Sequence, residues 1–365
     1  MRLLFWLLAA FFVVLTIFPL VRSARWWIRI SDFPRLQIAT ALAILLVGYL
    51  ALFGITDRWD ALFLAAIVPA LGLQLYRIFP YTVAAPVQVM KVSSHRPEAC
   101  IRVMISNVLM ENRQSDALLA VIRDVEPDLL LVVETDEWWH ERLKPLDDAY
   151  PHSIKRPQDN YYGMELFSKL ALDTDDVRFL LSGEIPSIRT GVRLPSGTWI
   201  DFFGVHPRPP DLDHDSEGRD AELLLVAREM RQSGRAAIVA GDMNDVAWSH
   251  TTRLFQRMSG ALDPRRGRGM FTTFHAGHRL LRWPLDHIFH DNSFTLVELR
   301  RLPYIGSDHF PVLAELQYEP GTEALQEAPL ADQDDHEETR EMIAEGREAA
   351  GQDSRPVDPA PPNAH

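Results

Sequence analysis

The stretch AAIVAGDMND, residues 236–245, joins an apolar run to a polar loop. Its small and branched apolar residues form the pattern of a buried β-strand, and Gly241-Asp242-Met243-Asn244 follows where that strand ends. Alternation along an extended segment places the side chains of Asp242 and Asn244 on the same side. Asp-x-Asn is also ordinary turn chemistry. The stretch alone therefore predicts either a simple turn or a catalytic loop at a strand end.

Five further blocks have the same character, with a carboxylate, carboxamide or imidazole at or just beyond the end of an apolar run. They are Ser106-Asn107-Val108, Val133-Glu134-Thr135, Gly204-Val205-His206-Pro207, Leu285-Asp286-His287-Ile288 and Gly306-Ser307-Asp308-His309. We expect strands at residues 101–105, 128–133, 199–205, 236–240, 285–289 and 312–316, with helices at 116–125 and 221–232. This alternation is typical of a packed α/β domain. Acids, amides and histidines at strand ends are what a divalent-metal phosphoester hydrolase requires.

Taken in order, these blocks resemble the endonuclease/exonuclease/phosphatase superfamily, which includes deoxyribonuclease-I-like nucleases, abasic-site endonucleases and neutral sphingomyelinases. The resemblance covers about residues 98–318. It implies an α/β fold in which two mixed β-sheets face each other, with helices outside, as a four-layered sandwich. The active site would lie at one end of the sheets.

The resemblance also implies roles for individual residues. Mg²⁺ (or Mn²⁺) would be held by Glu134, with Asn107 and Asp308 as further ligands, and Asn107 would also orient substrate phosphate. Asp242 would align and deprotonate the attacking water, and Asn244 would donate to a phosphate oxygen. The remaining catalytic residues would be His309 as a cationic phosphate ligand, Asp286 as the acid that orients it, and His206 as a second phosphate contact.

Substrate contacts are expected from Tyr162, a position that Tyr161 could also occupy, and from Arg265, Arg266 and Arg268. A solvated basic loop is the alternative for the three arginines. Asp245 has no assigned role. The other histidines, including His287, are expected to be surface or structural residues, because neither a His-Glu-x-x-His motif nor paired cysteines are present.

Residues 1–94 precede this catalytic part and contain three apolar stretches, at about residues 3–21, 36–54 and 61–79, each long enough to cross a bilayer as a helix. The first is longer than the apolar core of a typical signal peptide. The first loop carries Arg22, Arg25, Arg29 and Arg35, so the positive-inside rule places that loop and the catalytic part in the cytoplasm. We expect an integral membrane protein of a bacterial inner membrane, with the lipid bilayer as its partner.

Charge and composition divide the chain into residues 1–94, 95–318 and 319–365. The whole chain has a net charge of −13, and about −8 of it lies in the middle part. This balance does not suit a protein that coats nucleic acid. The tail from Glu319 is acidic and rich in Pro and Ala, so it is expected to be disordered, with helical character only near residues 337–350.

These features predict a membrane-anchored, divalent-metal-dependent phosphoester hydrolase of the phosphodiesterase or nuclease type. Its substrate would be a phosphodiester in a nucleic acid, a lipid headgroup or a small molecule. The alternative is a non-catalytic membrane scaffold or binding protein that retains the fold.

Overall fold

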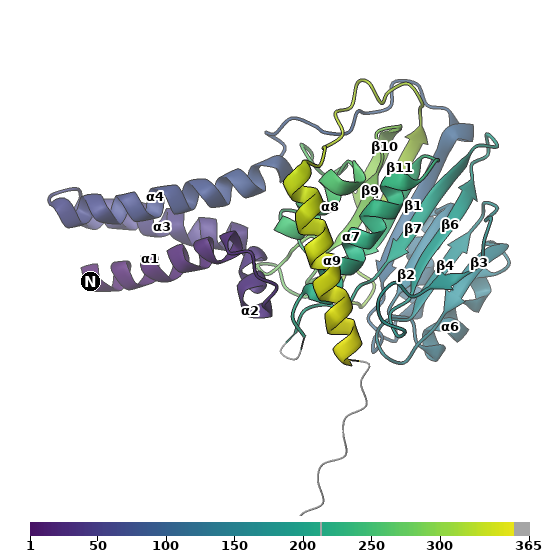
Figure 1. Ribbon diagram of the computed structural model, residues 1–365, viewed down its shortest axis with the longest axis horizontal. Helices are drawn as coiled ribbons and strands as arrows, with labels where there is room; N and C mark the ends of the chain where they lie inside the picture. The colour runs from purple at the N-terminus through teal and green to yellow at the C-terminus, as the bar shows by residue number, and fades with distance from the viewer. Residues whose placement is uncertain (212–213, 354–365) are drawn as a thin grey trace, which may run out of the picture.

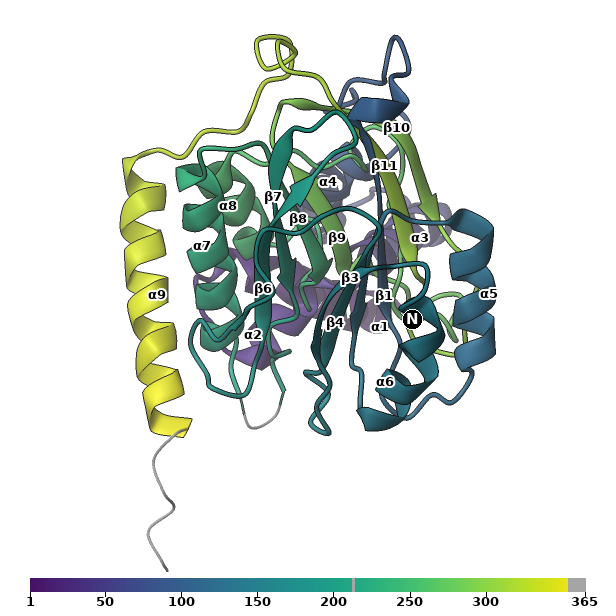
Figure 2. The same ribbon diagram turned by 90° about the vertical axis from the view of Figure 1, so that its right-hand side faces the viewer.

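A computed structural model describes residues 1–211 and 214–353. Two β-sheets face each other in the catalytic part (Figures 1 and 2). The six-stranded sheet has the order β10-β11-β1-β2-β4-β3, and the five-stranded sheet has the order β5-β6-β7-β8-β9. Their strands are β1 Cys100–Asn107, β2 Leu129–Val133, β3 His152–Arg156, β4 Met164–Ser168, β5 Val177–Arg178, β6 Ser187–Arg193, β7 Trp199–Val205, β8 Ala237–Asp242, β9 Asp286–His290, β10 Phe294–Arg301 and β11 Val312–Tyr318.

Both sheets are mixed, as predicted. One parallel pair lies in each sheet, β1 with β2 and β7 with β8, and the other neighbours are antiparallel. Alternation along β1 sends Ile101, Val103 and Ile105 into the core between the sheets, while Met104 faces the helices outside. The helices α5 Ser115–Val125 and α6 Glu137–Leu143 cover the six-stranded sheet, and α7 Glu217–Gln232 and α8 His250–Ser259 cover the other. The four-layered α/β sandwich is confirmed.

The prediction of a disordered tail was wrong for α9, Gln333–Asp353, which packs along α7 (Figures 1 and 2). Gly346 allows the close approach, since a Cβ there would lie 2.3 Å from the Cβ of Ala221. Arg257 on α8 holds Asp335 with two hydrogen bonds of 2.7 Å. Two of the acids that suggested a solvated tail, Asp335 and Glu338, thus pair with Arg257 and His250 on the domain. Residues 354–365 of the predicted tail lie outside the described residues.

The three apolar stretches form helices: α1 Arg2–Ile17, α3 Arg35–Phe53 and α4 Arg58–Ile78. They form a bundle that projects from the domain (Figure 1). Each helix is long and apolar enough to cross a membrane, and at most 28 % of each apolar window is buried inside the protein. The bundle therefore presents apolar side chains on most of its outer surface, as a membrane-associated helix bundle does.

One end of the bundle is joined to the domain through α2, Trp26–Arg29, and the segments around it. The Tyr81 hydroxyl donates to the Ala247 carbonyl at 2.7 Å, and the Trp248 indole donates to the Asp32 carbonyl at 2.7 Å. Ile78 and Leu285 pack in the same apolar cluster. The bundle thus packs directly on the segment that follows the 241–245 loop.

Candidate active site

Four strands deliver the expected side chains to one edge of the two sheets. The parallel strands β1 and β2 end at Asn107 and just before Glu134, and the parallel strands β7 and β8 end just before His206 and at Asp242. Parallel neighbours place their carboxyl ends at the same edge. The antiparallel strand β9 begins at Asp286, directly opposite Asp242 in the register. Residues far apart in the chain therefore meet because of the sheet topology.

The carboxamide of Asn107 joins the two sheets at this edge. Its amide nitrogen donates to Glu134 Oε1 at 2.7 Å and to Asp242 Oδ2 at 3.0 Å, while its oxygen accepts from the Leu109 N–H at 3.0 Å. The second oxygen of Glu134 accepts from the Met110 N–H at 3.3 Å. In this arrangement Asn107 orients the two carboxylates, and its oxygen keeps a second lone pair, so its role as a metal ligand stays a prediction.

His309 lies opposite this acid pair and is buried. Its Nδ1 donates to Asp286 Oδ2 at 2.8 Å, and its Nε2 lies 3.5 Å from Asp242 Oδ2. Burial alone would lower the pKa of His309, but Asp286 and Asp242 outweigh it and raise that pKa to about 10. Burial would likewise raise the pKa of Asp242, yet the nearby imidazoles hold that pKa below its usual value. At neutral pH the site therefore holds an imidazolium beside an ionised aspartate.

His206 and Asn244 complete the edge from the five-stranded sheet. His206 Nε2 lies 4.0 Å from Glu134 Oε1 and 3.9 Å from Asp242 Oδ2. Burial lowers the pKa of His206 to about 4, so this ring is neutral at pH 7. The Asn244 N–H donates to Asp242 Oδ1 at 2.9 Å, and the side-chain amide of Asn244 donates to the Pro207 carbonyl at 3.0 Å. One amide hydrogen of Asn244 remains for another acceptor.

The chemistry of the donor set fits a divalent cation near Glu134. Burial raises the pKa of Glu134 to about 7, and Asp242 and Asp308 add to the rise. Two crowded carboxylates with oxygen donors are the kind of site that a hard cation stabilises. Asp242, Asp286 and His309 also offer ligand atoms within 4.8 Å of one another. A protonated His309 has no lone pair to give, however, so we assign the cation to the side of Glu134.

A buried cluster of four charges supports the catalytic loop from behind, and it was not predicted. Arg219 donates to the Asn244 carbonyl at 2.9 Å and pairs with Asp220 at 2.7 Å. Arg29, from the segment between α1 and α3, pairs with Asp220 at 3.1 Å. Asp245 lies 3.8 Å from Arg219. All four are buried, so the Arg29/Asp220/Arg219/Asp245 cluster fixes the loop that carries Asp242 and Asn244.

Two of the three predicted arginine contacts to substrate are corrected, and that of Arg266 stays a prediction. Arg265 is buried and bound to Asp263 at 2.8 Å and to His287 Nδ1 at 2.6 Å, so it supports β9 from inside. Arg268 donates to the carbonyls of Pro264 and Val89. Their segment docks against the linker after α4, where the Gln88 N–H donates to the carbonyl of Arg266 at 3.4 Å. Arg268 and the backbone of Arg266 therefore help to join the linker to the domain.

Tyr162 lies beside the site, with its ring centroid 5.8 Å from that of His206. Burial raises the pKa of the Tyr162 hydroxyl. Tyr161 is instead exposed, and its hydroxyl bonds to Glu111. Of the two tyrosines that the sequence left open, Tyr162 is the one whose ring lies beside His206.

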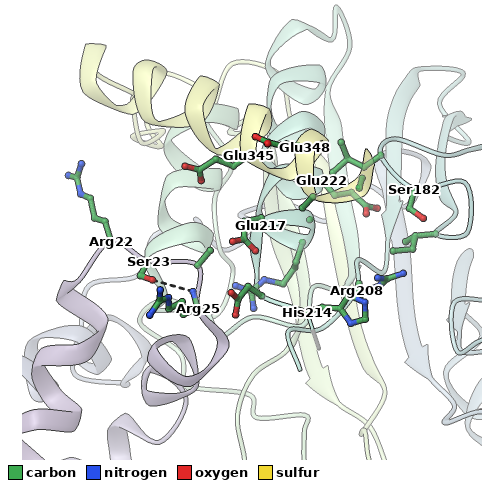
Figure 3. A pocket seen from close by; sticks show the side chains of 18 residues that line it. Arg22, Ser23, Arg25, Ser182, Arg208, His214, Glu217, Glu222, Glu345 and Glu348 are labelled. Carbon is green, nitrogen blue, oxygen red and sulfur yellow. Dashed lines mark hydrogen bonds between the residues drawn. The ribbon is translucent and has the colours of Figure 1, made fainter. Parts of the chain in front are cut away.

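A cleft of about 660 Å³ lies next to this site but does not contain the acid pair (Figure 3). It is lined by the segment before α2, the first turns of α7 and the last turns of α9. Arg219 contributes to its wall, so the cleft is on the rear of the catalytic loop. Glu222 also lines it, and among the described residues Glu222 Oε1 has no hydrogen-bond partner.

Comparison with known proteins identifies the family. A model described as the Endonuclease/Exonuclease/phosphatase family matches residues 104–309, more than half of the chain, and spans all the site residues from Asn107 to His309. The chain belongs to the endonuclease/exonuclease/phosphatase family. Members of this family hydrolyse phosphoester bonds, and the chain is an enzyme of that class.

Three solved structures resemble this chain, and the one with a TM-score of 0.50 supports the fold. D. rerio TDP2 complexed with a single-strand DNA product is 14 % identical, with a TM-score of 0.50, and the match covers 60 % of this chain and 99 % of that one. The human Nocturnin catalytic domain, with bound sulfate, is 16 % identical, with a TM-score of 0.49 over 62 % of this chain and 100 % of that one. A family protein from Beutenbergia cavernae is 17 % identical, with a TM-score of 0.49 over 60 % and 72 % of the two chains. A search of curated protein sequences gave no match.

Proposed function

We propose that this enzyme is a membrane-anchored phosphodiesterase that depends on Mg²⁺ or Mn²⁺. The observation that carries the proposal is the amide of Asn107, which holds Glu134 and Asp242 together while His309 lies against the same aspartate. A scaffold needs neither a buried acid pair nor a buried imidazolium, because each costs free energy to keep out of water.

Each residue then has a part in water attack on phosphorus. Glu134, with Asp308 nearby, would hold the cation, which neutralises phosphate oxygens when bound. Asp242 is ionised and held by Asn107 and Asn244, so it can align a water and accept its proton. The remaining amide hydrogen of Asn244 and the imidazolium of His309 can donate to phosphate oxygens, and His206 and Tyr162 lie on the same side.

The test uses the full-length protein in detergent with bis-p-nitrophenyl phosphate and added Mg²⁺ or Mn²⁺. Asp242→Asn should abolish hydrolysis, because the water loses its base. Asp175→Asn, which removes an exposed acid that is not among the site residues, should retain wild-type activity. If the wild-type protein hydrolyses the substrate no faster than the Asp242→Asn variant does, the proposal is refuted. Mn²⁺ binding that depends on Glu134 without hydrolysis would favour the scaffold alternative.

We also propose that the bundle spans the membrane with the catalytic part in the cytoplasm. The end of the bundle beside the domain carries Arg22, Arg25, Arg29 and Arg35, whereas Arg2 pairs with Asp57 at the far end at 3.3 Å. Alkaline phosphatase fused after residue 365 should be inactive in bacterial cells. Active fusion protein would reverse the orientation.

A further inference from the structure

The 274–283 hairpin connects the catalytic histidine to the bundle. Phe274 and Trp283 pair through their backbones, with the Phe274 N–H donating to the Trp283 carbonyl at 3.0 Å. The His275 N–H donates to the Leu281 carbonyl at 3.3 Å, which closes the loop at residues 276–280. The chain turns at Ala276-Gly277, and Leu280-Leu281 on the returning arm form the exposed apolar end of the hairpin, which we call its tip.

The base of this hairpin contacts the active site directly. Phe274 bridges to His309 through the backbone, and the two rings have centroids 5.0 Å apart. The Ala276 N–H donates to the Asp308 carbonyl at 2.6 Å. The position of the hairpin therefore determines where Asp308 and His309 lie.

The tip lies against the first turn of α3, at the end of the bundle that faces the domain. The Gln37 side chain donates to the Leu280 carbonyl at 2.7 Å. Phe33, just before α3, contacts Trp283 with ring centroids 5.8 Å apart. Since α3 is apolar enough to cross a bilayer from Arg35 to Phe53, the tip lies at the depth where that span begins.

The side chains at the tip suit a bilayer surface and not water. Leu280 is 84 % exposed, and Leu281 beside it is also exposed. Exposed Arg279 precedes the two leucines, whereas Arg282 after them donates to the Ala276 carbonyl at 2.8 Å. Exposed Trp27, Ile30 and Leu36 lie on the adjoining segments at the same end of the bundle. Apolar side chains beside an exposed arginine are typical of segments that insert among lipid headgroups.

We propose that the 274–283 hairpin inserts its tip into the leaflet where α3 begins, and that the enzyme hydrolyses phosphodiesters of lipids in that leaflet. This inference rests on the proposed hydrolase function. A substrate anchored in the membrane would present its phosphate beside His309 without leaving the bilayer. Proteins that bind a long nucleic acid usually present a basic surface. Because the catalytic part has a net negative charge, a lipid substrate is favoured over a long nucleic acid.

Insertion can be measured without any reaction. Cys100, the single native cysteine, is buried, so Leu280→Cys offers a selective labelling site for an environment-sensitive fluorophore. In nanodiscs of phosphatidylcholine and phosphatidylglycerol in equal parts, lipids with a spin label near the headgroup should quench this probe. The same probe at Leu325→Cys should not be quenched, because Leu325 is 70 % exposed and belongs to the segment before α9. Equal quenching at the two positions would overturn the insertion.

Substrate class is measured in the same nanodiscs. Leu280→Asp/Leu281→Asp should lower the ratio of phosphatidylglycerol hydrolysis to bis-p-nitrophenyl phosphate hydrolysis by roughly tenfold or more, because aspartate is disfavoured in the bilayer. Leu325→Asp should leave the ratio unchanged. Faster turnover of single-stranded DNA than of any lipid would overturn the lipid assignment. Failure of wild-type protein on both the soluble and the lipid substrate would instead refute the hydrolase proposal, whatever the quenching shows.

Discussion

Replacing Arg29 by methionine removes one of the four charges buried behind the catalytic loop. Two acids, Asp220 and Asp245, would then share Arg219 alone, and the cluster would carry an uncompensated negative charge. Removing one partner of a buried ion pair costs about 3–5 kcal/mol. For a domain of this size, that loss lowers the melting temperature by roughly 6–20 °C. Hydrolysis should fall as well, because Arg219 would be drawn away from the Asn244 carbonyl.

The matched control is Arg25→Met, which makes the same charge change at an exposed position four residues away. Its effect should stay within about 0.5 kcal/mol. Adding Asp220→Asn to Arg29→Met restores neutrality, so the double variant should be more stable than additivity of the two single variants predicts. Thermal unfolding and bis-p-nitrophenyl phosphate hydrolysis of the full-length protein measure both effects. If Arg29→Met melts and turns over like Arg25→Met, the cluster does not support the loop.

Three further outcomes are expected. Asp286→Asn should shift the alkaline limb of the kcat–pH profile to lower pH, because Asp286 helps to raise the pKa of His309 to about 10; an unmoved limb would contradict this. Burial raises the pKa of Glu222 to about 8 from an ordinary 4.5, so the contribution of Glu222 to stability is greatest below pH 4.5 and is lost as the pH rises through about 8. Glu222→Gln should therefore stabilise the protein at about pH 9, by up to about 5 kcal/mol, and hardly at all at about pH 4, as thermal unfolding would show. Gly346→Ala should loosen α9 from α7 by about 1–3 kcal/mol and speed its proteolytic removal, whereas Gly351→Ala, with open space around it, should not.

Sequence was sufficient for the parts of the site that depend on strand ends. Asn107, Glu134, His206 and Asp242 each follow an apolar run, and any fold that pairs those runs in parallel brings them to one edge. The family resemblance predicted two facing sheets, and this arrangement places the parallel pair β1 and β2 opposite the parallel pair β7 and β8. The pairing of His309 with Asp286, expected from that resemblance, is present in the structure.

Sequence was insufficient where a charged residue finds its partner across the fold. Arg265 looks like part of a solvated basic loop, but Asp263 and His287 enclose it inside the domain. The acids of α9 look like a solvated tail, but Asp335 meets Arg257 on a helix more than seventy residues earlier. Composition cannot distinguish a free charge from a paired one, because the pairing depends on which surfaces the fold brings together.

The segment between α1 and α3 also contacts the active site through other residues. Two lines of contact leave the segment between α1 and α3 and reach opposite sides of the reaction centre. One runs from Arg29 through Asp220 and Arg219 to the Asn244 carbonyl. The other runs from Phe33 through Trp283 and Phe274 to His309. Residues 95–318 alone would lack the start of both lines, so the bundle supports the geometry of the site.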